Sequence, residues 1–320
     1  MIELNRGLRL IGTELWLDST RARPLGFISH AHGDHTGKHR RVLTTPHTWR
    51  LCRHRLSARS EHLALDYHQP FEVDGLRVTL FPYGHMLGAA QILIENGQRV
   101  VYTGDMKLRP NLTVPGAEVV PCDVLIIECT FGQARYVFPS LAEVARQVTA
   151  FIERAFEDRQ VPVLLAYITG KSQEVLKLLQ RHGYTACLAR DAYRVARLYE
   201  TCGVEFGAYE PLSGSGNLHG KVVVLPPHLA RTRALARIPN RRVAVLTGWA
   251  IDPGAADRYG ADEAIPWSDH ADFDELCEYV DRARPARVFT VHGRDDFSRH
   301  LRGRGYRAEH LAPGVQLPLY

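Results

Sequence analysis

The sequence predicts an α/β protein with a separate α/β unit near its middle. Three patterns favour this class. Short β-like runs fill the first third of the chain, helices and strands alternate after Pro139, and the last stretch returns to the first pattern. With 320 residues and 45% hydrophobic content, the chain is long enough for one large domain or two ordinary ones, each with a sizeable core.

The first third reads as consecutive strands of one or two sheets. Its apolar runs are LRLIG, ELWLD, LGFIS, LRVTLF, AQILIE and RVVYTGD. The last two are joined by Asn96-Gly97, a dipeptide typical of tight hairpin turns. A stronger run, VLIIE at 124–128, predicts a strand that is buried on both faces and ends in a carboxylate.

The middle of the chain predicts a parallel sheet flanked by helices. The stretch SLAEVARQVTAFIERAFEDR has helical spacing, with Ser140 as its N-cap and Glu143 completing a capping box. It is followed by the strands VPVLLAY, TACLA, KVVVLP and RRVAVLTG and by the helices KSQEVLKLLQRHG and DAYRVARLYETCG. SGSGN at 213–217 reads as a loop. A helix from Asp272, the strand RVFTVHG and an arginine-rich helix near 294–304 complete the chain.

Charge, cysteine usage and hydropathy narrow the function classes. Forty Lys and Arg against 35 Asp and Glu give a formal charge of +5, a mild excess that suits a polyanionic partner. The six cysteines contain no CxxC pair, which argues against a disulfide framework and against a thiolate zinc site. The N-terminus lacks an apolar signal segment and no run approaches the ~20 residues of a membrane helix, so we expect a cytoplasmic protein without a membrane partner.

The stretch FISHAHGDHTG at 27–37 predicts a metal site. It places His30, His32, Asp34 and His35 within six positions, and such crowded polar groups need a cation between them. His30 and His32 alternate as side chains do at a strand end, and Gly33 allows a turn that aims the next two residues elsewhere. One loop can thereby supply two adjacent metal ions.

Two metal ions need further ligands, and the sequence offers them where later strands end. These candidates are His85 in YGHMLGAA, Asp105 in YTGDMK and His292 in TVHGR, each beside a glycine. Alone, each is equally well explained as a turn residue or a hydrogen-bonded histidine. Together with the first loop they form a donor set of nitrogen and oxygen atoms.

These motifs resemble the metallo-β-lactamase superfamily, and their wording is similar to the β-CASP nucleases. The phrases that carry the resemblance are WLDS, SHAHGDH, GHMLGAAQ, YTGDMK, ECTFG, TGW, SDHADF and VHG, spread from end to end of the chain. The resemblance implies a four-layer αββα metallo-β-lactamase fold with an inserted α/β β-CASP domain. It implies a division into residues 1–136 and 248–320 for the first domain and 137–247 for the insert.

The resemblance also assigns the metal ligands. It implies that His30, His32 and His85 hold one ion, that Asp34, His35 and His292 hold the other, and that Asp105 bridges them. Asp18 would accept the free ring N–H of a ligand histidine, although a turn aspartate is the simpler interpretation. Nitrogen and oxygen donors favour zinc, with manganese as the alternative.

The resemblance implies three catalytic residues, namely Asp34 and two residues outside the first loop. His270 in SDHADF is similar to the histidine that protonates a leaving alkoxide, and Glu128 is similar to the acidic residue that holds that imidazole. A carboxylate at the end of an apolar strand independently calls for a partner at a site edge. The alternative for SDHAD is a simple helix N-cap.

The compact layout is similar to bacterial β-CASP exonucleases associated with a DNA ligase and a helicase in repair. A single strand of DNA is therefore the favoured substrate, while His292 at the last motif is a pattern associated with RNA-cutting relatives. Lys171 and Ser172 open a predicted helix and are candidate phosphate-binding residues. Cys129 replaces an expected hydroxyl residue. A small-molecule ester hydrolase and a metal-free scaffold remain alternatives.

Overall fold

The structure, a computed structural model, describes residues 2–4, 7–213, 217–312 and 316–317. The chain divides into two compact units. Unit 1 comprises Met1–Pro110, Val114–Ala134 and His270–Tyr320, and unit 2 comprises Asn111–Thr113 and Arg135–Asp269. The predicted insert, 137–247, lies inside unit 2, which continues to Asp269. The domain boundaries themselves remain a prediction.

The described residues of unit 1 form two mixed sheets of seven strands each. The first has the order β20 (Gln316–Leu317), β1 (Ile2–Leu4), β2 (Leu8–Leu10), β3 (Leu15–Leu17), β4 (Leu25–Phe27), β5 (Arg41–Thr44) and β6 (Glu61–Ala64). The second has the order β19 (Ala308–His310), β18 (Arg287–Val291), β11 (Val124–Glu128), β10 (Arg99–Tyr102), β9 (Ala90–Glu95), β8 (Leu76–Pro82) and β7 (Phe71–Val73).

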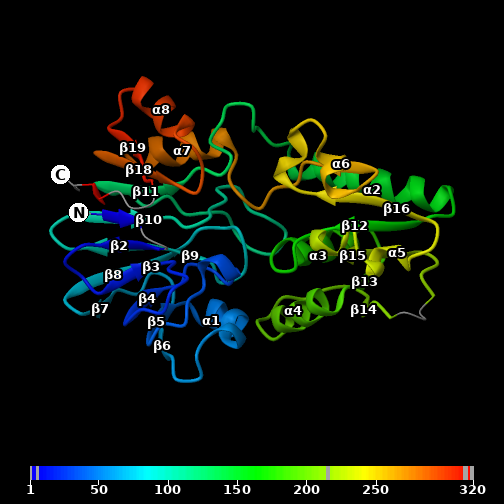
Figure 1. The fold of residues 1–320 in the computed structure, drawn as a ribbon, viewed down its shortest axis with the longest axis horizontal. Coiled ribbons are helices and arrows are strands. Elements are labelled where there is room, and N and C mark those ends of the chain that lie inside the picture. Colours follow the sequence, from blue (N-terminus) through cyan, green and yellow to red (C-terminus); the bar gives the residue numbers. More distant parts are fainter. Residues whose placement is uncertain (1, 5–6, 214–216, 313–315, 318–320) are drawn as a thin grey trace. The chain divides into compact units, whose positions relative to one another are not determined.

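The two sheets pack face to face through one apolar core. Leu17 and Phe27 of the first sheet and Ile92 and Ile126 of the second all belong to it. Helices α7 (Phe273–Ala283) and α8 (Asp296–Gly303) lie beside the second sheet, and α1 (Pro46–Cys52) lies beside the first (Figure 1). The two sheets bury one face each against the other and have helices beside them (Figure 1), which agrees with the predicted four-layer αββα fold.

Unit 2 is a parallel sheet with helices, as predicted from the alternating pattern. Among the residues that the structure describes, its strand pairs are all parallel. The strand order is β14 (Tyr209–Pro211), β13 (Thr185–Leu188), β15 (Lys221–Leu225), β12 (Val161–Leu165), β16 (Arg241–Leu246) and β17 (Glu263–Ile265). Its helices are α2 (Leu141–Glu157), α3 (Lys171–Arg181), α4 (Arg190–Glu200), α5 (Arg233–Ala236) and α6 (Ala255–Tyr259).

Local signals in the sequence are confirmed where they were strong. The Ser140 side chain accepts a hydrogen bond from the Glu143 N–H and caps α2, and Asp272 caps α7 in the same way. Strand β11 is buried along its whole length, and β9 pairs with β10 across the Asn96-Gly97 turn. The predicted loop at 213–217 lies largely outside the described residues. Within the described part of the chain, none of the helices combines the length and the apolarity required to span a bilayer.

The buried ring of His39 gives unit 1 a predicted pH dependence. A Cβ added at Gly26 would lie 2.3 Å from this ring, so the ring is tightly enclosed. Burial lowers the pKa of His39 from 6.5 to about 4. Because the unfolded chain then binds the proton more readily, stability present above pH 6.5 is lost as the pH falls toward 4, by up to roughly 3 kcal/mol. Unfolding titrations between pH 7 and 4 should show a smaller loss of unfolding free energy for His39→Gln than for wild type. Parallel curves for the two proteins would contradict the role of His39 in this pH dependence.

Candidate metal centre

Strand ends of both sheets deliver the predicted site residues to one edge of unit 1. Strands β10, β11 and β18 are parallel neighbours, so their carboxyl ends lie together, and Asp105, Glu128 and His292 lie at or after those ends. The loop after β4 carries His30 and His32. The Ala90 N–H donates to the Ser29 carbonyl at 2.9 Å and joins that loop to the start of β9.

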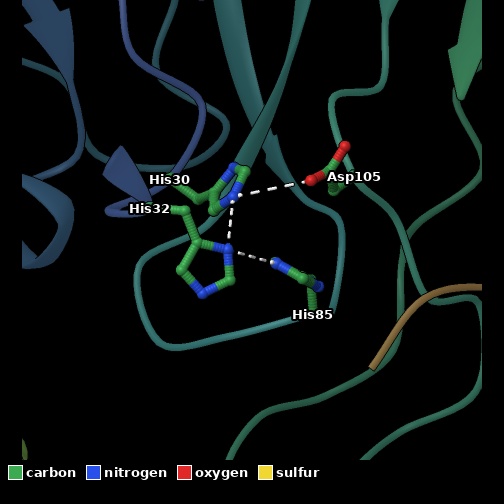
Figure 2. A group of neighbouring side chains, drawn as sticks. All are labelled: His30, His32, His85 and Asp105. Atoms are coloured by element: carbon green, nitrogen blue, oxygen red, sulfur yellow. Dashed lines mark hydrogen bonds and ion pairs between the residues drawn. The ribbon is translucent and has the colours of Figure 1, made fainter. Parts of the chain in front are cut away.

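His30, His32, His85 and Asp105 form one cluster of potential ligands. One donor atom from each lies within 4.8 Å of the others. Nε2 of His30 is 2.9 Å from Nδ1 of His32, and Nε2 of His85 is 3.3 Å from the same atom. Figure 2 shows the three rings turned toward one another, with the Asp105 carboxylate facing His30. The sequence prediction for the first ion names these three histidines.

A second cluster shares the Asp105 carboxylate. It contains His35, Asp105 and His292. Oδ2 of Asp105 lies 3.1 Å from Nε2 of His35 and 3.7 Å from Nε2 of His30. One carboxylate oxygen therefore faces both clusters, the geometry that a bridging ligand needs.

Burial and charge oppose each other at this carboxylate. Burial alone would raise the pKa of Asp105, but the neighbouring His35 imidazole outweighs it and holds that pKa well below the usual range. Burial likewise works to lower the pKa of His35, while Asp105 and Asp18 raise it well above the ordinary value. Asp105 is therefore an anion in the interior, held there by positive charge.

Asp34 is the predicted ligand that the structure leaves outside both clusters. Its side chain is 82% exposed, with Oδ2 at 3.9 Å from Nε2 of His35. Asp34 lies in the single turn η1 (Gly33–His35), and the next residue of that turn, His35, is buried. A solvated carboxylate avoids the cost of burial, which explains the outward orientation. Its roles in metal binding and catalysis remain predictions that require the side chain to rotate.

Three residues of the site have unusual backbone conformations. Asp18, His85 and His292 have φ angles of +49°, +57° and +59°. Residues other than glycine seldom occupy this left-handed region, because the Cβ then crowds the backbone, and strain of this kind concentrates at functional sites. The surrounding structure therefore holds these side chains where relaxed loops would not place them.

Asp18 orients two of the clustered histidines, His35 directly and His30 through Ser29. Its Oδ2 accepts hydrogen bonds from Nδ1 of His35 at 2.9 Å, from the Ser29 hydroxyl at 2.6 Å and from the Tyr102 hydroxyl at 2.8 Å. Because the Ser29 hydroxyl gives its proton to Asp18, its contact with Nδ1 of His30 at 3.0 Å makes that ring nitrogen the donor. Both rings thus turn Nε2 toward the cluster, the nitrogen that would bind a metal ion once it is deprotonated.

Sequence reasoning found Asp18 but missed Ser29 and Tyr102. Ser29 directly precedes His30, and Tyr102 ends β10 three residues before Asp105. Serine and tyrosine at such positions are common, so nothing in the sequence marked them. Only the convergence of three chain segments on one carboxylate reveals their part.

The Asp18→Asn variant is expected to bind divalent metal about 10- to 100-fold more weakly. An amide removes the negative charge and one acceptor, so His35 and the Ser29 relay to His30 lose their orientation. Competition with a zinc chelator measures the affinity. Asp66→Asn, an exposed aspartate of unit 1, is the matched control. Equal affinities for both variants would contradict the orienting role.

His270 and Glu128 form a hydrogen-bonded pair beside the first cluster. Nδ1 of His270 lies 2.9 Å from Oε1 of Glu128, which is fully buried and also accepts from the Met106 N–H at 2.8 Å. Oε2 of Glu128 accepts from the Thr130 N–H at 3.2 Å. With the carboxylate fixed, Nδ1 of His270 is the donor of this hydrogen bond.

The pair is close to the histidine cluster. The His270 and His85 rings lie 4.9 Å apart, and the His270 side chain is 21% exposed. The Ala271 N–H donates to the Met106 carbonyl at 2.6 Å, which fastens the histidine loop to the loop that carries Asp105. The alternative interpretation of SDHAD as a helix N-cap alone is therefore incomplete. Asp272 does cap α7, but the His270 ring also lies beside the His85 ring.

The donor set fits divalent metal ions. Ring nitrogens of His30, His32 and His85 lie about one hydrogen-bond length apart beside a buried carboxylate, and the other ring nitrogens of His30 and His35 bond Ser29 and Asp18. Such an arrangement is repulsive without positive charge at its centre and is the usual ligand chemistry of zinc in proteins. The donor chemistry of both clusters therefore fits a divalent ion, and the roles of the individual residues as ligands remain a prediction.

The candidate phosphate-binding residues Lys171 and Ser172 face the interior of unit 2. The Lys171 ammonium is fully buried, bonds Oε2 of Glu174 at 2.9 Å and lies 3.9 Å from Oδ1 of Asp269. The Ser172 hydroxyl donates to the Tyr167 carbonyl at 2.7 Å. With both groups engaged by internal acceptors, the geometry does not favour contact with a phosphate, and the function proposed below does not use them.

Cys129 is buried next to Gly293. Burial raises the pKa of its thiol to about 12, so sulfur is present as the neutral thiol. The thiol donates to the Arg294 carbonyl at 3.6 Å. A Cβ at Gly293 would lie 2.2 Å from the Cys129 carbonyl oxygen, so this glycine is needed for close packing behind His292.

Two family models match the chain. The model described as "Beta-lactamase superfamily domain" matches residues 20–163, and "Zn-dependent metallo-hydrolase RNA specificity domain" matches residues 263–312. The second match covers His270 and His292. A solved structure, "Crystal Structure of a Protein of Unknown Function from Enterococcus faecalis V583", superposes with a TM-score of 0.61 at 14% identity, over 90% of this chain and 79% of that one.

The curated relatives include proteins with nuclease and ligase names. "Probable DNA ligase" of Opitutus terrae is 37% identical over 99% of this chain and 32% of its own length. "Endoribonuclease YSH1" of Candida albicans is 24% identical over 72% of this chain and 33% of its own. "5' exonuclease Apollo" of Gallus gallus is 26% identical over 89% and 63%. The chain spans about a third of the length of the first two.

A sandwich of two sheets whose edge gathers buried histidines around an aspartate defines a metal-dependent hydrolase. The matches to both family models agree with this class. The chain belongs to the metallo-β-lactamase superfamily and carries a β-CASP-like domain.

Proposed function

We propose that this chain hydrolyses the phosphodiester bonds of nucleic acid strands with two divalent metal ions. The observation that carries the proposal is the pair of donor clusters that share Asp105, with the His270–Glu128 pair directly beside them. His30, His32 and His85 would hold one ion, and His35 and His292 the other, with Asp105 between them and Asp34 within reach of the second by side-chain rotation. Zinc is the proposed metal and manganese the alternative.

Divalent ions held by these residues would activate water at neutral pH and would offset negative charge on a phosphoryl group. The residues of the chain supply the remaining requirements. Asp18 and Ser29 hold the His35 and His30 rings so that Nε2 faces the site. The fully buried Glu128 holds the His270 ring, and Nε2 of His270 donates the proton that the departing sugar oxygen needs.

DNA is the proposed polymer, and the proposed activity is an exonuclease that acts in repair. Support comes from the relative named as a probable DNA ligase, which is similar over nearly the whole chain, and from the relative named as a 5' exonuclease. A DNA ligase is therefore the proposed partner, with a helicase of the same repair system. We place the activity in the cytoplasm.

RNA is the second candidate substrate. The match to an RNA specificity domain over residues 263–312 and the relative named as an endoribonuclease support it. The same metal clusters and the same proton donor would serve, because the two polymers share the phosphodiester bond.

The test is hydrolysis of end-labelled single-stranded DNA and of RNA with the same sequence, each with zinc or manganese. We expect stepwise shortening of the DNA and no product from the His30→Ala variant. Faster decay of the RNA would assign the ribonuclease function. Equal decay with wild type and His30→Ala would contradict hydrolysis by this site, since a contaminant would then be responsible.

A further inference from the structure

A segment beside the metal centre carries an unusual concentration of positive charge. Residues 35–60 contain seven Lys and Arg residues and no Asp or Glu, more than the formal charge of +5 for the whole chain. The segment includes α1 and the short helix η2 (Arg53–Arg55) that directly follows it. Arg50, Arg53 and Arg55 fall within six positions. We call α1 and η2 the basic rim.

The basic rim is fastened to both loops that carry the first histidine cluster. At its start, the hydroxyl groups of Thr45 and Thr48 donate to the Gly88 carbonyl at 2.6 and 2.8 Å, three residues after His85. At its end, the Arg55 guanidinium donates to the carbonyl of Ala31, the residue between His30 and His32. The rim therefore borders the site through direct bonds, all of them within unit 1.

The approach at Gly88 is too close for any side chain. A Cβ there would lie 2.6 Å from both the Cβ of His47 and the N–H nitrogen of Thr48. Because these atoms belong to the backbone or are bonded directly to it, they cannot move aside without shifting α1, and the glycine is needed to bring α1 against the His85 loop. The position of the rim is thus built into the fold.

Arg53 and Arg55 of the rim are positioned by neutral groups. Arg53 donates to the Ser57 carbonyl and lies over the Trp49 ring at 5.2 Å, and the His62 ring stacks on Trp49 at 4.2 Å. A carbonyl and an aromatic ring position a guanidinium without neutralising it. Within the described residues, Arg53 and Arg55 have no carboxylate partner, whereas Arg41 of the same segment pairs with Asp74.

We propose that the basic rim binds the phosphate backbone of the single nucleic acid strand that enters the metal centre. Guanidinium groups match phosphate geometry, and helical spacing places Arg50 and Arg53 on one face, so successive phosphates have successive partners. Contacts of this kind are independent of base sequence. The proposal rests on the proposed function for the identity of the ligand, and it concerns binding alone.

The test measures binding separately from hydrolysis. The probe is a fluorescein-labelled single-stranded DNA oligonucleotide, followed by fluorescence anisotropy in metal-loaded full-length protein that carries His270→Gln to slow cleavage. The test protein adds Arg50→Gln and Arg53→Gln. The matched control adds Arg282→Gln and Arg299→Gln, two exposed arginines of unit 1 that pair with carboxylates. Thermal unfolding checks that both proteins are folded.

We expect the rim variant to lose about tenfold or more in affinity, and the control about twofold or less. The slope of log affinity against log salt should fall by roughly 0.7 for each phosphate contact removed. Unchanged affinity and slope, equal losses in rim and control variants, or no binding by the parent protein would each overturn the proposal. Strand hydrolysis is assayed separately. If the wild-type protein hydrolyses DNA but the rim substitutions leave DNA affinity unchanged, only this inference is wrong. If the rim substitutions weaken binding but the wild-type protein does not hydrolyse the strand, only the proposed function is wrong.

Discussion

The Asp105→Asn variant is expected to lose at least about a hundredfold to a thousandfold in strand hydrolysis and to retain fewer metal ions than wild type. Oδ2 of Asp105 faces His35 at 3.1 Å and His30 at 3.7 Å, so one substitution affects both clusters. An amide is neutral and a poor bridging ligand. Without the negative charge of Asp105, two metal ions in the proposed positions would repel each other. Losses of this size are typical when a preorganised charge is removed from a reacting centre.

The measurement combines initial rates on end-labelled DNA with metal content after dialysis. Asp34→Asn is the informative comparison, because the Asp34 carboxylate is exposed and contributes to one ion at most. Its loss should be smaller in both rate and metal content. If Asp105→Asn retained wild-type metal content and activity, Asp105 would not be the shared ligand.

The His270→Gln variant is expected to slow cleavage of DNA by about 10²- to 10⁴-fold while metal content stays at the wild-type level. The imidazole is held by Glu128 at Nδ1 and is proposed to protonate the leaving sugar oxygen, a poor leaving group without a proton. Glu128→Gln should produce the same type of defect at a smaller magnitude, because a glutamine oxygen still accepts from the ring but no longer stabilises its positive form.

A second substrate separates proton donation from a structural role. A p-nitrophenyl phosphodiester releases p-nitrophenolate, which leaves without protonation, so His270→Gln should slow its cleavage far less than it slows cleavage of DNA. Rates on both substrates, measured beside metal content, give the comparison. An equal loss on the two substrates would argue that His270 positions the site instead of donating a proton.

Much of the fold was predictable because local and long-range signals agree in this chain. Strands such as β11 are continuous apolar runs, and α2 carries both its periodicity and its cap at Ser140. Strands of three residues such as β14 and β17 were missed, because their short segments contribute only part of a hydrophobic face and take their conformation from the neighbouring strand. The extension of unit 2 to Asp269 follows from the pairing of β17.

The candidate site was predictable where residue type alone indicates chemistry. Histidines and an aspartate at strand ends led to the residues that the structure gathers around Asp105, although their roles as ligands remain proposals. Side-chain direction was not predictable. Asp34 turns to solvent beside an inward-facing His35, and Lys171 turns to Glu174 inside unit 2, since neighbours distant in sequence supply the acceptors. Ser29 and Tyr102 carry no chemical signal until Asp18 brings them together.

The most direct test is anomalous X-ray diffraction from crystals of the zinc-loaded protein, with data collected on both sides of the zinc absorption edge. Two peaks about 3.5–4 Å apart are expected, one among His30, His32 and His85 and one between His35 and His292, with Asp105 touching both. An edge-specific signal that lies elsewhere, or none at these side chains in zinc-saturated crystals, would contradict the two-metal centre from which the proposed activity follows.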